Sequence, residues 1–582
     1  MERTLPLLFA LSVLAFWAAP KVLPRKATPS LTLKKHPVLL GLALLLLLAG
    51  SGQAARAAEP PALALTPPMG WNDWAHYQCD YTAQTIVDNA RALVKTGLAA
   101  RGYNTVTIDD CWMQKDRNAQ GNLQADPARF PHGMKPVIEA VHKLGLKFGI
   151  YEDSGYLTCG GFAGSGEVNG GGRNYFLQDA KLFASWGVDY LKLDGCNLYS
   201  PKGESQNEVY RRAYLEESEA LRQVSRPIVF SESAPAYFQG DPEWYSVLTW
   251  VRGYGQLWRE GSDIATFDSK QPDRPRFRSV EWNYSYNLPL ARFQKPNNWN
   301  DADFIIGGDG GMTIPETRSD LALWSMMSAP LILSDNLSTV SPEAISILGN
   351  RAVIAVDQDH LGLTATLVSR SPQQDVLLKP LANGDYAVAV FNRSGATLPV
   401  SLPLADLGFA QGSACHASAR NLWTRAEEPA VTALTANLVS HDTAIWRIHT
   451  DSACGRATRT GAVVRIFANV WQHKHVAYTR CLTAPGSVEA CQGTAAERWT
   501  ATASQQLRSV SGQCLTAQGN TLKLSACTES AAARWHYTLA GNLVNGSNHQ
   551  CLTGSDAGAL SLATCGHNLD TQIWALPTRL PR

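Results

Sequence analysis

The feature that most constrains the fold is an alternation of short apolar segments with helical segments between about residues 63 and 359. In the helical segments apolar residues recur three or four positions apart, as at Ile86, Ala90 and Leu93, before Gly102 ends the pattern. Parallel strands need crossover helices, and eight strand–helix units close into a barrel. We therefore predict a (β/α)8 TIM barrel. Its expected strands lie, in chain order, in PMGW, YNTVTIDD, LKFGIYED, VDYLKLDG, RPIVFSES, TWVRGYG, NNWNDADF and APLILSD.

Length and charge bound the number of domains and exclude some functions. A chain of 582 residues is expected to hold about three or four domains of average length, and a barrel is as long as two of them. The 51 Lys and Arg residues nearly balance the 50 Asp and Glu residues, so no basic surface for nucleic acid is expected. The 17 Trp and 18 Tyr residues are typical of carbohydrate-active proteins, and of many other secreted proteins.

The first 58 residues resemble an export signal rather than a folded domain. An apolar run at residues 37–50 follows Lys34-Lys35 and precedes Ala55-Arg56-Ala57, which is the pattern of a secretory signal peptide. This run is shorter than the ~20 residues that cross a bilayer. A second apolar run at residues 5–19 leaves a two-segment membrane anchor as the alternative. We predict a secreted or periplasmic protein.

The cysteine pattern agrees with export. The chain has 12 cysteines and no CxxC motif, so a zinc knuckle or a thioredoxin-like site has no support. An even number of cysteines in an exported chain favours disulfide bonds. We expect Cys415 and Cys454 to form one of them.

The pattern changes after the expected catalytic barrel, which we place at residues 59–361. Alternating segments without helices follow, and Asn383-Gly384 between two of them indicates a hairpin. This part predicts a small antiparallel β-sandwich at residues 362–453.

Residues 454–582 contain an internal repeat. Three segments each begin with Cys-Leu-Thr, contain a second cysteine and end near a tryptophan, at Trp499, Trp535 and Trp574. Three stacked copies predict a β-trefoil that resembles ricin-type lectin modules. Such modules usually bind sugar through an Asp shortly after the first cysteine, and its place is taken here by a threonine, so sugar binding stays open. The expected disulfides are Cys481–Cys491, Cys514–Cys527 and Cys551–Cys565, and the threonines are Thr483, Thr516 and Thr553.

Polar residues gather where the expected barrel strands end. In a barrel these ends converge on one mouth, where the active sites of this fold lie. A random scatter of structural ion pairs would not prefer one end. The residues are Trp71, Asp109, Asp110, Tyr151, Glu152, Asp153, Lys192, Asp194, Glu232, Ser233, Arg259, Asp263, Asp301 and Asp303.

Two carboxylates at this mouth suit glycoside hydrolysis. A retaining enzyme needs one carboxylate as nucleophile and another as proton donor. Lys192 and Asp194 are two apart on a strand and share a face, so a cation would lie beside an anionic nucleophile. The donor needs surroundings that raise its pKa. Spacing alone does not choose among Asp263, Asp301 and Asp303 for that role.

At this point the chain resembles a known family. The motifs PPMGWNDW, TIDDCWM, LQADPARFPHGMK, LKFGIYED, YLKLDGC, WNDADF and SAPLILSDNL, with Arg259 four residues before Asp263, are similar in order to glycoside hydrolase family 27, the α-galactosidases and α-N-acetylgalactosaminidases. The resemblance covers about two-thirds of the chain. It implies retaining hydrolysis of a terminal α-galactosyl residue, with Asp194 as nucleophile and Asp263 as acid/base.

The resemblance also implies a set of substrate contacts. No cofactor is expected, and no metal is expected either, because His473-Lys474-His475 contains the only close pair of histidines and is interpreted as a solvated loop. Trp71 would stack on the sugar, Asp109 and Asp110 would accept bonds from its 4- and 6-hydroxyl groups, and Lys192 would reach the 3- and 4-hydroxyls. A fixed pair of acceptors distinguishes an axial 4-hydroxyl, because the wrong sugar leaves them unpaired. Tyr151, Arg259 and Asp303 would complete the site, and the family disulfides would be Cys79–Cys111 and Cys159–Cys196.

The segment FSESAPAYF departs from the α-galactosidase pattern. Aligned on Pro235 and Tyr237, it places Ser233 and Ala236 where N-acetylgalactosaminidases have a serine and an alanine that make room for the acetamido group. A shift of the loop would instead bring Glu232 to the 2-hydroxyl. No cysteine precedes Arg259 to pair with this segment.

The prediction is therefore a retaining exo-α-galactosidase acting on terminal, non-reducing α-galactose of oligo- or polysaccharides. The alternative is an α-N-acetylgalactosaminidase, which the Ser233 and Ala236 pair favours, and Tyr237 is expected in the substrate pocket in either case. A β-L-arabinopyranosidase would be expected to alter Asp109, which is present. A non-catalytic sugar-binding protein is the remaining alternative, and the intact Asp194 and Asp263 argue against it.

Overall fold

The computed structural model describes residues 61–167, 171–410, 414–455, 460–466, 479–566 and 569–577. The expected signal at residues 1–58 and the expected solvated loop at residues 473–475 lie outside these ranges. Within them, no helix combines the length and the apolar character that a membrane span requires.

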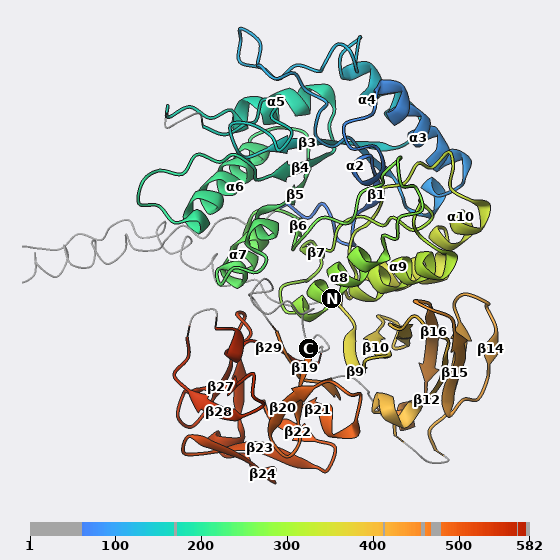
Figure 1. The fold of residues 1–582 in the computed structure, drawn as a ribbon, viewed down its shortest axis with the longest axis vertical. Helices are drawn as coiled ribbons and strands as arrows, with labels where there is room; N and C mark the ends of the chain where they lie inside the picture. Colours follow the sequence, from blue (N-terminus) through green and yellow to red (C-terminus); the bar gives the residue numbers. More distant parts are fainter. Residues whose placement is uncertain are drawn as a thin grey trace, which may run out of the picture. The chain divides into compact units, whose positions relative to one another are not determined.

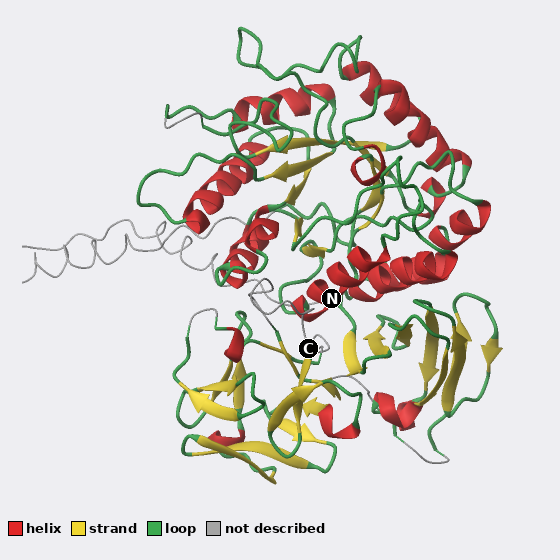
Figure 2. Cartoon of the chain, in the orientation of Figure 1, coloured by secondary structure: helices red, strands yellow, loops and turns green. Residues whose placement is uncertain are grey.

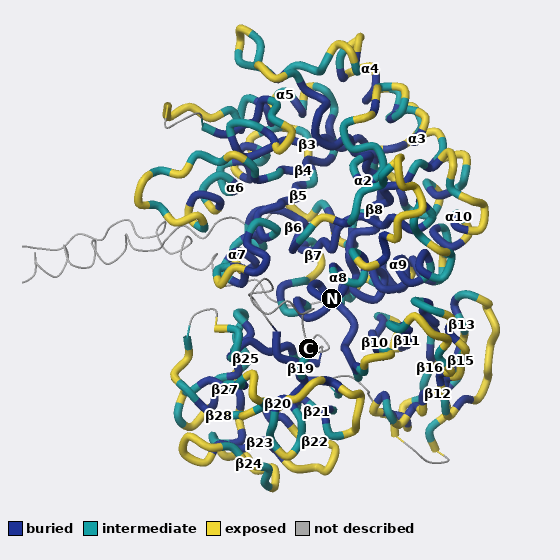
Figure 3. The backbone as a smooth tube through the Cα atoms, in the orientation of Figure 1, coloured by how far each residue is buried: buried dark blue, intermediate teal, exposed yellow. Residues whose placement is uncertain are grey.

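The predicted barrel is confirmed by an eight-stranded parallel sheet in the order β7-β6-β5-β4-β3-β2-β1-β8 (Figures 1 and 2). The closure between its last two strands is made just after β7, where Ile305 bridges in parallel to Leu333. Figure 3 shows the strands among the buried segments. The strands are β1 Met69–Asn72, β2 Thr105–Thr107, β3 Lys147–Asp153, β4 Tyr190–Asp194, β5 Val229–Glu232, β6 Leu257–Arg259, β7 Trp299–Asp301 and β8 Leu331–Leu333.

Helices surround this sheet and begin at clear sequence signals. Thr82, Ser205 and Thr313 each cap a helix, and each exchanges hydrogen bonds with the residue three positions later. Ile86, Ala90 and Leu93 of α3 are buried, as their spacing predicted. The helices are α2 Trp74–Tyr77, α3 Ala83–Lys95, α4 Lys135–Lys143, α5 Phe176–Trp186, α6 Gln206–Arg222, α7 Trp244–Trp250, α8 Phe277–Asn287, α9 Ile314–Met327, α10 Pro342–Leu348 and α11 Arg351–Asp357.

One expected strand is wrong. The segment TWVRGYG ends helix α7 and continues as a 3-10 turn at Val251–Gly253, while the sixth strand is Leu257–Arg259. The buried residues Trp244, Val247 and Leu248, followed by Val251, recur at helical spacing. The segment TWVRGYG contains only the last two residues of α7, so its own residues are too few to show the helical period.

The sandwich prediction is also confirmed. A six-stranded sheet in the order β14-β13-β16-β11-β10-β9 is accompanied by a two-stranded sheet of β12 and β15. Asn383-Gly384 joins β10 to β11 as an antiparallel hairpin, and Gly384 adopts a positive φ of 91°. The strands are β9 Thr366–Arg370, β10 Gln374–Pro380, β11 Tyr386–Asn392, β12 Leu398–Pro403, β13 Ala417–Asn421, β14 Glu427–Glu428, β15 Ala433–Leu438 and β16 Thr443–Thr450.

The repeats of the last domain form equivalent contacts in three dimensions. The buried indole N–H of Trp499, Trp535 and Trp574 donates to the backbone carbonyl of the leucine in the Cys-Leu-Thr of its own repeat, at 2.8, 3.0 and 2.9 Å. The strands are β17 Thr460–Ala462, β18 Val464–Arg465, β19 Arg480–Thr483, β20 Ser487–Ala490, β21 Arg498–Ala501, β22 Leu507–Ser509, β23 Gln513–Gln518, β24 Thr521–Ala526, β25 Trp535–Tyr537, β26 Leu543–Asn545, β27 Cys551–Gly554, β28 Leu560–Ala563 and β29 Trp574–Ala575.

All 12 cysteines are paired, and the pairs are those that the sequence indicated. They are Cys79–Cys111, Cys159–Cys196, Cys415–Cys454, Cys481–Cys491, Cys514–Cys527 and Cys551–Cys565.

A buried ion pair of the sandwich is hydrogen-bonded to a tyrosine of the barrel. Asp375 of β10 accepts two hydrogen bonds from Arg370 of β9, at 2.7 and 2.5 Å, and one from the hydroxyl group of Tyr284 on α8, at 2.9 Å. The carboxyl group of Asp375 is fully buried, and the Arg370 side chain is nearly so. Removing one partner of such a pair leaves an uncompensated charge in the interior.

We predict that Asp375→Asn lowers the free energy of unfolding by about 3 kcal/mol, because the Arg370 guanidinium would remain buried without its counter-ion. Chemical denaturation measures the change. The matched control is Asp88→Asn, which breaks the exposed Arg91–Asp88 pair and should cost less than about 1 kcal/mol. Equal losses in the two variants would contradict the prediction.

Candidate active site

A cavity of about 300 Å³ opens at the carboxyl ends of the barrel strands. This volume is at the lower end of the range for small-ligand sites. It brings together residues from six successive strands, β1 to β6, or from the segments that directly follow them. Its lining consists of Trp74, Asp109, Asp110, Tyr151, Cys159, Lys192, Asp194, Cys196, Ser233, Ala236, Tyr237, Arg259, Gly261, Ser262 and Asp263.

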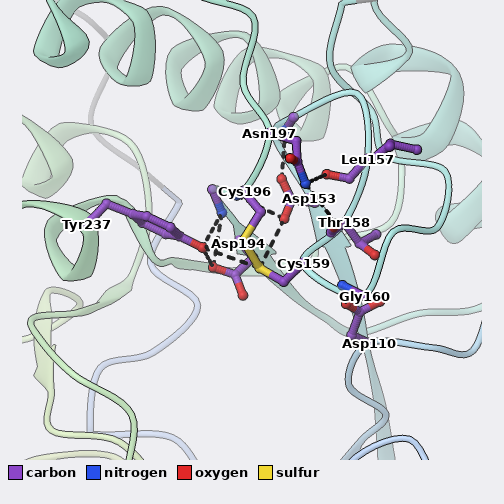
Figure 4. The surroundings of a disulfide bond; sticks show 12 residues. Asp110, Asp153, Leu157, Thr158, Cys159, Gly160, Asp194, Cys196, Asn197 and Tyr237 are labelled. Carbon is purple, nitrogen blue, oxygen red and sulfur yellow. Dashed lines mark hydrogen bonds between the residues drawn. A yellow bond between two sulfur atoms is a disulfide. The ribbon is translucent and has the colours of Figure 1, made fainter.

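Asp194, at the end of β4, is held by two donors. The hydroxyl group of Tyr237 donates to Asp194 Oδ1 at 2.5 Å, and the backbone N–H of Gly195 donates to the same oxygen at 3.0 Å (Figure 4). A side chain at residue 195 would not fit, since a Cβ there would lie 2.7 Å from Tyr210 and 2.9 Å from Tyr237. The glycine therefore lets the two tyrosines pack directly beneath the carboxylate.

Lys192 bonds to Asp109 rather than to Asp194. Its ammonium group donates to both oxygens of Asp109, at 3.0 and 2.8 Å, and Asn72 donates to the same carboxylate at 2.8 Å. Burial opposes the charge of Lys192, yet Asp109 and then Asp194 outweigh it and raise the pKa of the lysine above its usual value. The cation thus stays charged and favours both neighbouring anions.

Asp263 lies beside Arg259 at the end of β6. Arg259 Nη2 is 3.1 Å from Asp263 Oδ1, and Arg259 Nη1 is 3.0 Å from Asp303 Oδ1. The Asp263 side chain is 72% exposed, whereas Asp303 is buried. Desolvation opposes the charge of Asp263, but Arg259 and Lys192 outweigh it and hold its pKa below the usual value. This differs from the expectation that the donor's surroundings raise its pKa.

Asp110 and Tyr151 also line the cavity. The backbone N–H groups of Cys111 and Gly160 donate to the two oxygens of Asp110, at 2.6 and 2.7 Å. Tyr151 donates its hydroxyl group to the buried carboxylate of Asp153 at 3.3 Å. The carboxylate of Asp110 is therefore fixed in orientation by the backbone while it faces the cavity.

The Cys159–Cys196 disulfide forms part of the wall (Figure 4). Among the described residues, Asp153, Cys159 and Cys196 alone bring three acidic, cysteine or histidine ligand atoms within 4.8 Å of one another. The sulfur atoms of Cys159 and Cys196 are bonded to each other, so neither is a thiolate that could bind a metal.

With this geometry established, similar proteins identify the family. The sequence profile described as "Alpha galactosidase A" matches residues 66–359, which is half of the chain. The chain belongs to the α-galactosidase A family. This confirms the resemblance to glycoside hydrolase family 27, and the protein is a glycoside hydrolase. Profiles of an "Alpha galactosidase C-terminal beta sandwich domain" and a "Ricin-type beta-trefoil lectin domain" match residues 371–448 and 472–574.

Three relatives of this α-galactosidase A family member match between 62% and 89% of its length. "Alpha-galactosidase A" of Aspergillus niger is 39% identical over 531 residues, which cover 89% of this chain and 93% of the relative. "Alpha-galactosidase 2" of Arabidopsis thaliana is 36% identical over 361 residues, 62% of this chain and 83% of the relative. The crystal structure of α-galactosidase I from Mortierella vinacea has a TM-score of 0.59 at 29% identity, and the match covers 68% of this chain and 99% of that chain.

The tryptophan in the cavity is not the expected one. Trp71 lies within β1, is fully buried, and donates its indole N–H to the carbonyl of Asp335 at 2.8 Å. Trp74, which follows the strand, lines the cavity instead. The rule that barrel sites form beyond the strand ends would have favoured Trp74, since Trp71 pairs with neighbouring strands on both sides.

Most of the other expected residues line the cavity, and Asp303 does not. Asp303 instead orients Arg259, which lines the cavity. Gly261 and Ser262 line it and were missed, because neither residue type stands out in a loop. All remaining expected substrate residues line the cavity: Asp109, Asp110, Tyr151, Lys192, Ser233, Ala236, Tyr237 and Arg259.

Glu232 points away from the cavity. Its side chain is fully buried, and neither carboxyl oxygen accepts a hydrogen bond from another side chain. This burial raises the pKa of Glu232 well above the usual value. A Cβ at Gly255 would lie 2.6 Å from Glu232 Oε1, so this carboxyl group fills the space beside the glycine. The alternative in which Glu232 reads the 2-hydroxyl group is therefore not what this structure shows, and Ser233 and Ala236 occupy that wall.

We predict that Tyr237→Phe lowers kcat by about ten- to a hundredfold and changes KM little. The variant loses the hydroxyl group that orients Asp194, and a hydrogen bond to a charged group contributes about 1.5–3 kcal/mol. Steady-state kinetics on a chromogenic glycoside measures both constants. Tyr199→Phe, outside the cavity, serves as the control, and a kcat of Tyr237→Phe that matches this control would disprove the orienting role.

Proposed function

We propose that the protein is a retaining exo-α-galactosidase that removes terminal, non-reducing α-galactose from oligo- or polysaccharides. The observation that carries this proposal is that Asp194 and Asp263 line one cavity together with the Lys192–Asp109 pair. Two carboxylates, one held by neutral donors and one beside an arginine, suit a nucleophile and an acid/base.

Asp194 would attack the anomeric carbon in the first step. The bond from this carbon to the leaving oxygen breaks as a glycosyl–Asp194 ester forms, and Asp263 gives its proton to the leaving oxygen. In the second step Asp263 takes a proton from water, and the water oxygen displaces Asp194 from the anomeric carbon. A lowered pKa beside Arg259 favours the ionised form of Asp263, which is the form that the second step requires. For the first step, the bound sugar has to exclude water and weaken the 3.1 Å contact with Arg259.

Galactose recognition would rest on fixed acceptors. Asp109 and Asp110 line the cavity, and donors from the protein fix the orientation of each carboxylate, so that both can meet the 4- and 6-hydroxyl groups in a defined geometry. A sugar with an equatorial 4-hydroxyl would leave one acceptor unpaired, and this costs affinity. Trp74 supplies the aromatic wall on which the sugar ring would stack.

The proposed roles predict different effects of the two carboxylates. Asp194→Asn should lower kcat on p-nitrophenyl α-galactoside by at least about a thousandfold, because no nucleophile remains. Asp263→Ala should cost about 10²–10⁴-fold on substrates with poor leaving groups and much less on activated ones. Added azide should restore part of the activity of Asp263→Ala on activated substrates, because azide attacks the glycosyl-enzyme in place of water and needs no general base.

Asp268→Asn, at a half-buried position in the loop beyond Asp263 and outside the cavity, is the matched control and should keep wild-type rates. Near wild-type turnover by Asp194→Asn would refute the nucleophile. Equal losses on good and poor leaving groups in Asp263→Ala would exclude a proton donor at that position.

A second candidate function is supported by one wall of the cavity. Ser233 and Ala236 line it, Ala236 is small, and the carboxyl group of Glu232 lies outside. This leaves room for a 2-acetamido group and a hydroxyl group to bond it, so α-N-acetylgalactosaminidase activity is the alternative.

We predict that Ala236→Leu lowers kcat/KM on p-nitrophenyl 2-acetamido-α-galactoside at least about tenfold more than on the parent galactoside, because the larger side chain fills that space. Wild-type enzyme is compared on both substrates under one set of conditions. If wild-type enzyme does not hydrolyse the acetamido substrate, the alternative function is wrong. A proportional loss on both substrates would show that Ala236 does not face C2.

We further propose that the chain is exported and that the trefoil contacts polysaccharide. The six disulfides support an oxidising compartment. Each threonine that replaces the usual aspartate, Thr483, Thr516 and Thr553, donates its hydroxyl group to the carbonyl of the preceding cysteine, at 3.4, 3.1 and 3.0 Å. Sugar contact by this domain would therefore depend on other side chains.

A further inference from the structure

A second, larger cavity of about 510 Å³ lies away from the barrel mouth. One wall comes from the segment between α3 and β2 and from the junction of α10 and α11, and the other comes from β13 of the sandwich and the turn after it. None of its residues lines the active-site cavity. Since the segment between α3 and β2 precedes a barrel strand, the cavity is at the amino-terminal end of the barrel, opposite to the catalytic carboxylates.

The charged lining of this cavity is entirely cationic. Arg101, Arg351, Arg420 and Arg425 line it, and no Asp or Glu does, although the whole chain is nearly neutral. Among the described residues, Arg420 alone of the four has a carboxylate partner, Glu427 at 3.7 Å, and both side chains are exposed. Guanidinium groups stay charged at every physiological pH, so the cavity keeps an uncompensated positive charge.

Two further residues fix the shape of the cavity. Trp423 donates its indole N–H to the carbonyl of Thr443 at 2.7 Å, so what it offers to the cavity is aromatic surface. Asn350 caps α11 with its Oδ1 and donates its Nδ2 to the carbonyl of Leu422 at 2.9 Å. This last bond ties the barrel wall to the sandwich wall next to the tryptophan.

We propose that this arginine cavity binds an anionic saccharide, a short run of pyranose rings that carry carboxylate groups. Arginine forks match the two oxygens of a carboxylate with paired hydrogen bonds, and all four cations here are arginines rather than lysines. An aromatic surface beside them fits the apolar face of a pyranose ring, which a free inorganic anion would not use. The volume falls within the range of small-ligand sites.

This site extends the function beyond hydrolysis at the barrel mouth. A polymer of uronic acids bound at the arginine cavity would hold the enzyme on an acidic polysaccharide, while the mouth on the other end acts on neutral side chains. The proposal does not depend on which sugar the active site cleaves, because the two cavities share no residue.

Calorimetric titration of the full chain with trigalacturonate tests the proposal, with excess galactose present to occupy the active site. Cellotriose is the neutral probe of equal length. We expect trigalacturonate to bind, cellotriose to bind at least about tenfold more weakly, and added salt to weaken trigalacturonate binding. The double variant Arg351→Gln/Arg425→Gln should bind trigalacturonate about a hundredfold more weakly, at about tenfold for each lost charged hydrogen-bonding group.

Arg278→Gln, an exposed arginine on α8 outside the cavity, is the matched control and should bind as wild type does. All variants should hydrolyse a small chromogenic glycoside at the wild-type rate, which shows that they are folded. Trp423→Leu should weaken the binding of trigalacturonate but leave competition by inorganic sulfate unchanged. Titration with a sulfated trisaccharide distinguishes sulfate esters from carboxylates as the natural anion.

Three results would overturn the proposal. Equal binding of cellotriose would show that charge is not recognised. Wild-type affinity of the double variant would place the site elsewhere on the chain. Displacement of trigalacturonate by inorganic sulfate at the same molar concentration, with no effect of Trp423→Leu, would reduce the cavity to a simple anion site.

Discussion

The buried contact between Lys192 and Asp109 is the constraint on which the active site depends. The two residues come from β4 and the end of β2, with β3 between them, and they meet only because the barrel curves these ends toward one axis. Burying a charge is costly unless a partner compensates it, and here Asp109 and Asp194 both do so. The pair therefore fixes the floor of the cavity and keeps a cation next to the carboxylate that we propose as nucleophile.

A second contact, centred on Arg259, gives the two proposed catalytic carboxylates different surroundings. Arg259 lies between Asp263 and Asp303, and the buried Asp303, whose pKa burial raises to about 6, holds the guanidinium from behind. Asp194 is instead held by a tyrosine hydroxyl group and a backbone N–H. One site thus gives two aspartates different partners, which is the usual physical basis for giving them different chemical roles.

The three domains carry their polar groups differently. The barrel concentrates them at one mouth, whereas the trefoil uses its repeated tryptophan N–H and threonine hydroxyl groups on its own backbone. Between barrel and sandwich, four arginines remain without buried carboxylate partners and define a cavity of a different chemical type. The two cavities therefore differ in kind: the barrel mouth pairs its charged groups with one another, whereas the second cavity has cations alone.

Local periodicity in the sequence determined seven of the eight barrel strands, the Asn383-Gly384 hairpin and the trefoil repeat, because strand and helix spacings are properties of neighbouring residues. It also placed the chemically active residue types at strand ends. Only the tertiary structure decided which side chains face the cavity: Trp74 and not Trp71, Ser233 and not Glu232. A period of two separates the faces of a strand without saying which one turns inward, and the partner of Lys192 lies 83 residues away in the chain. Such choices depend on how the barrel closes, which no local pattern contains.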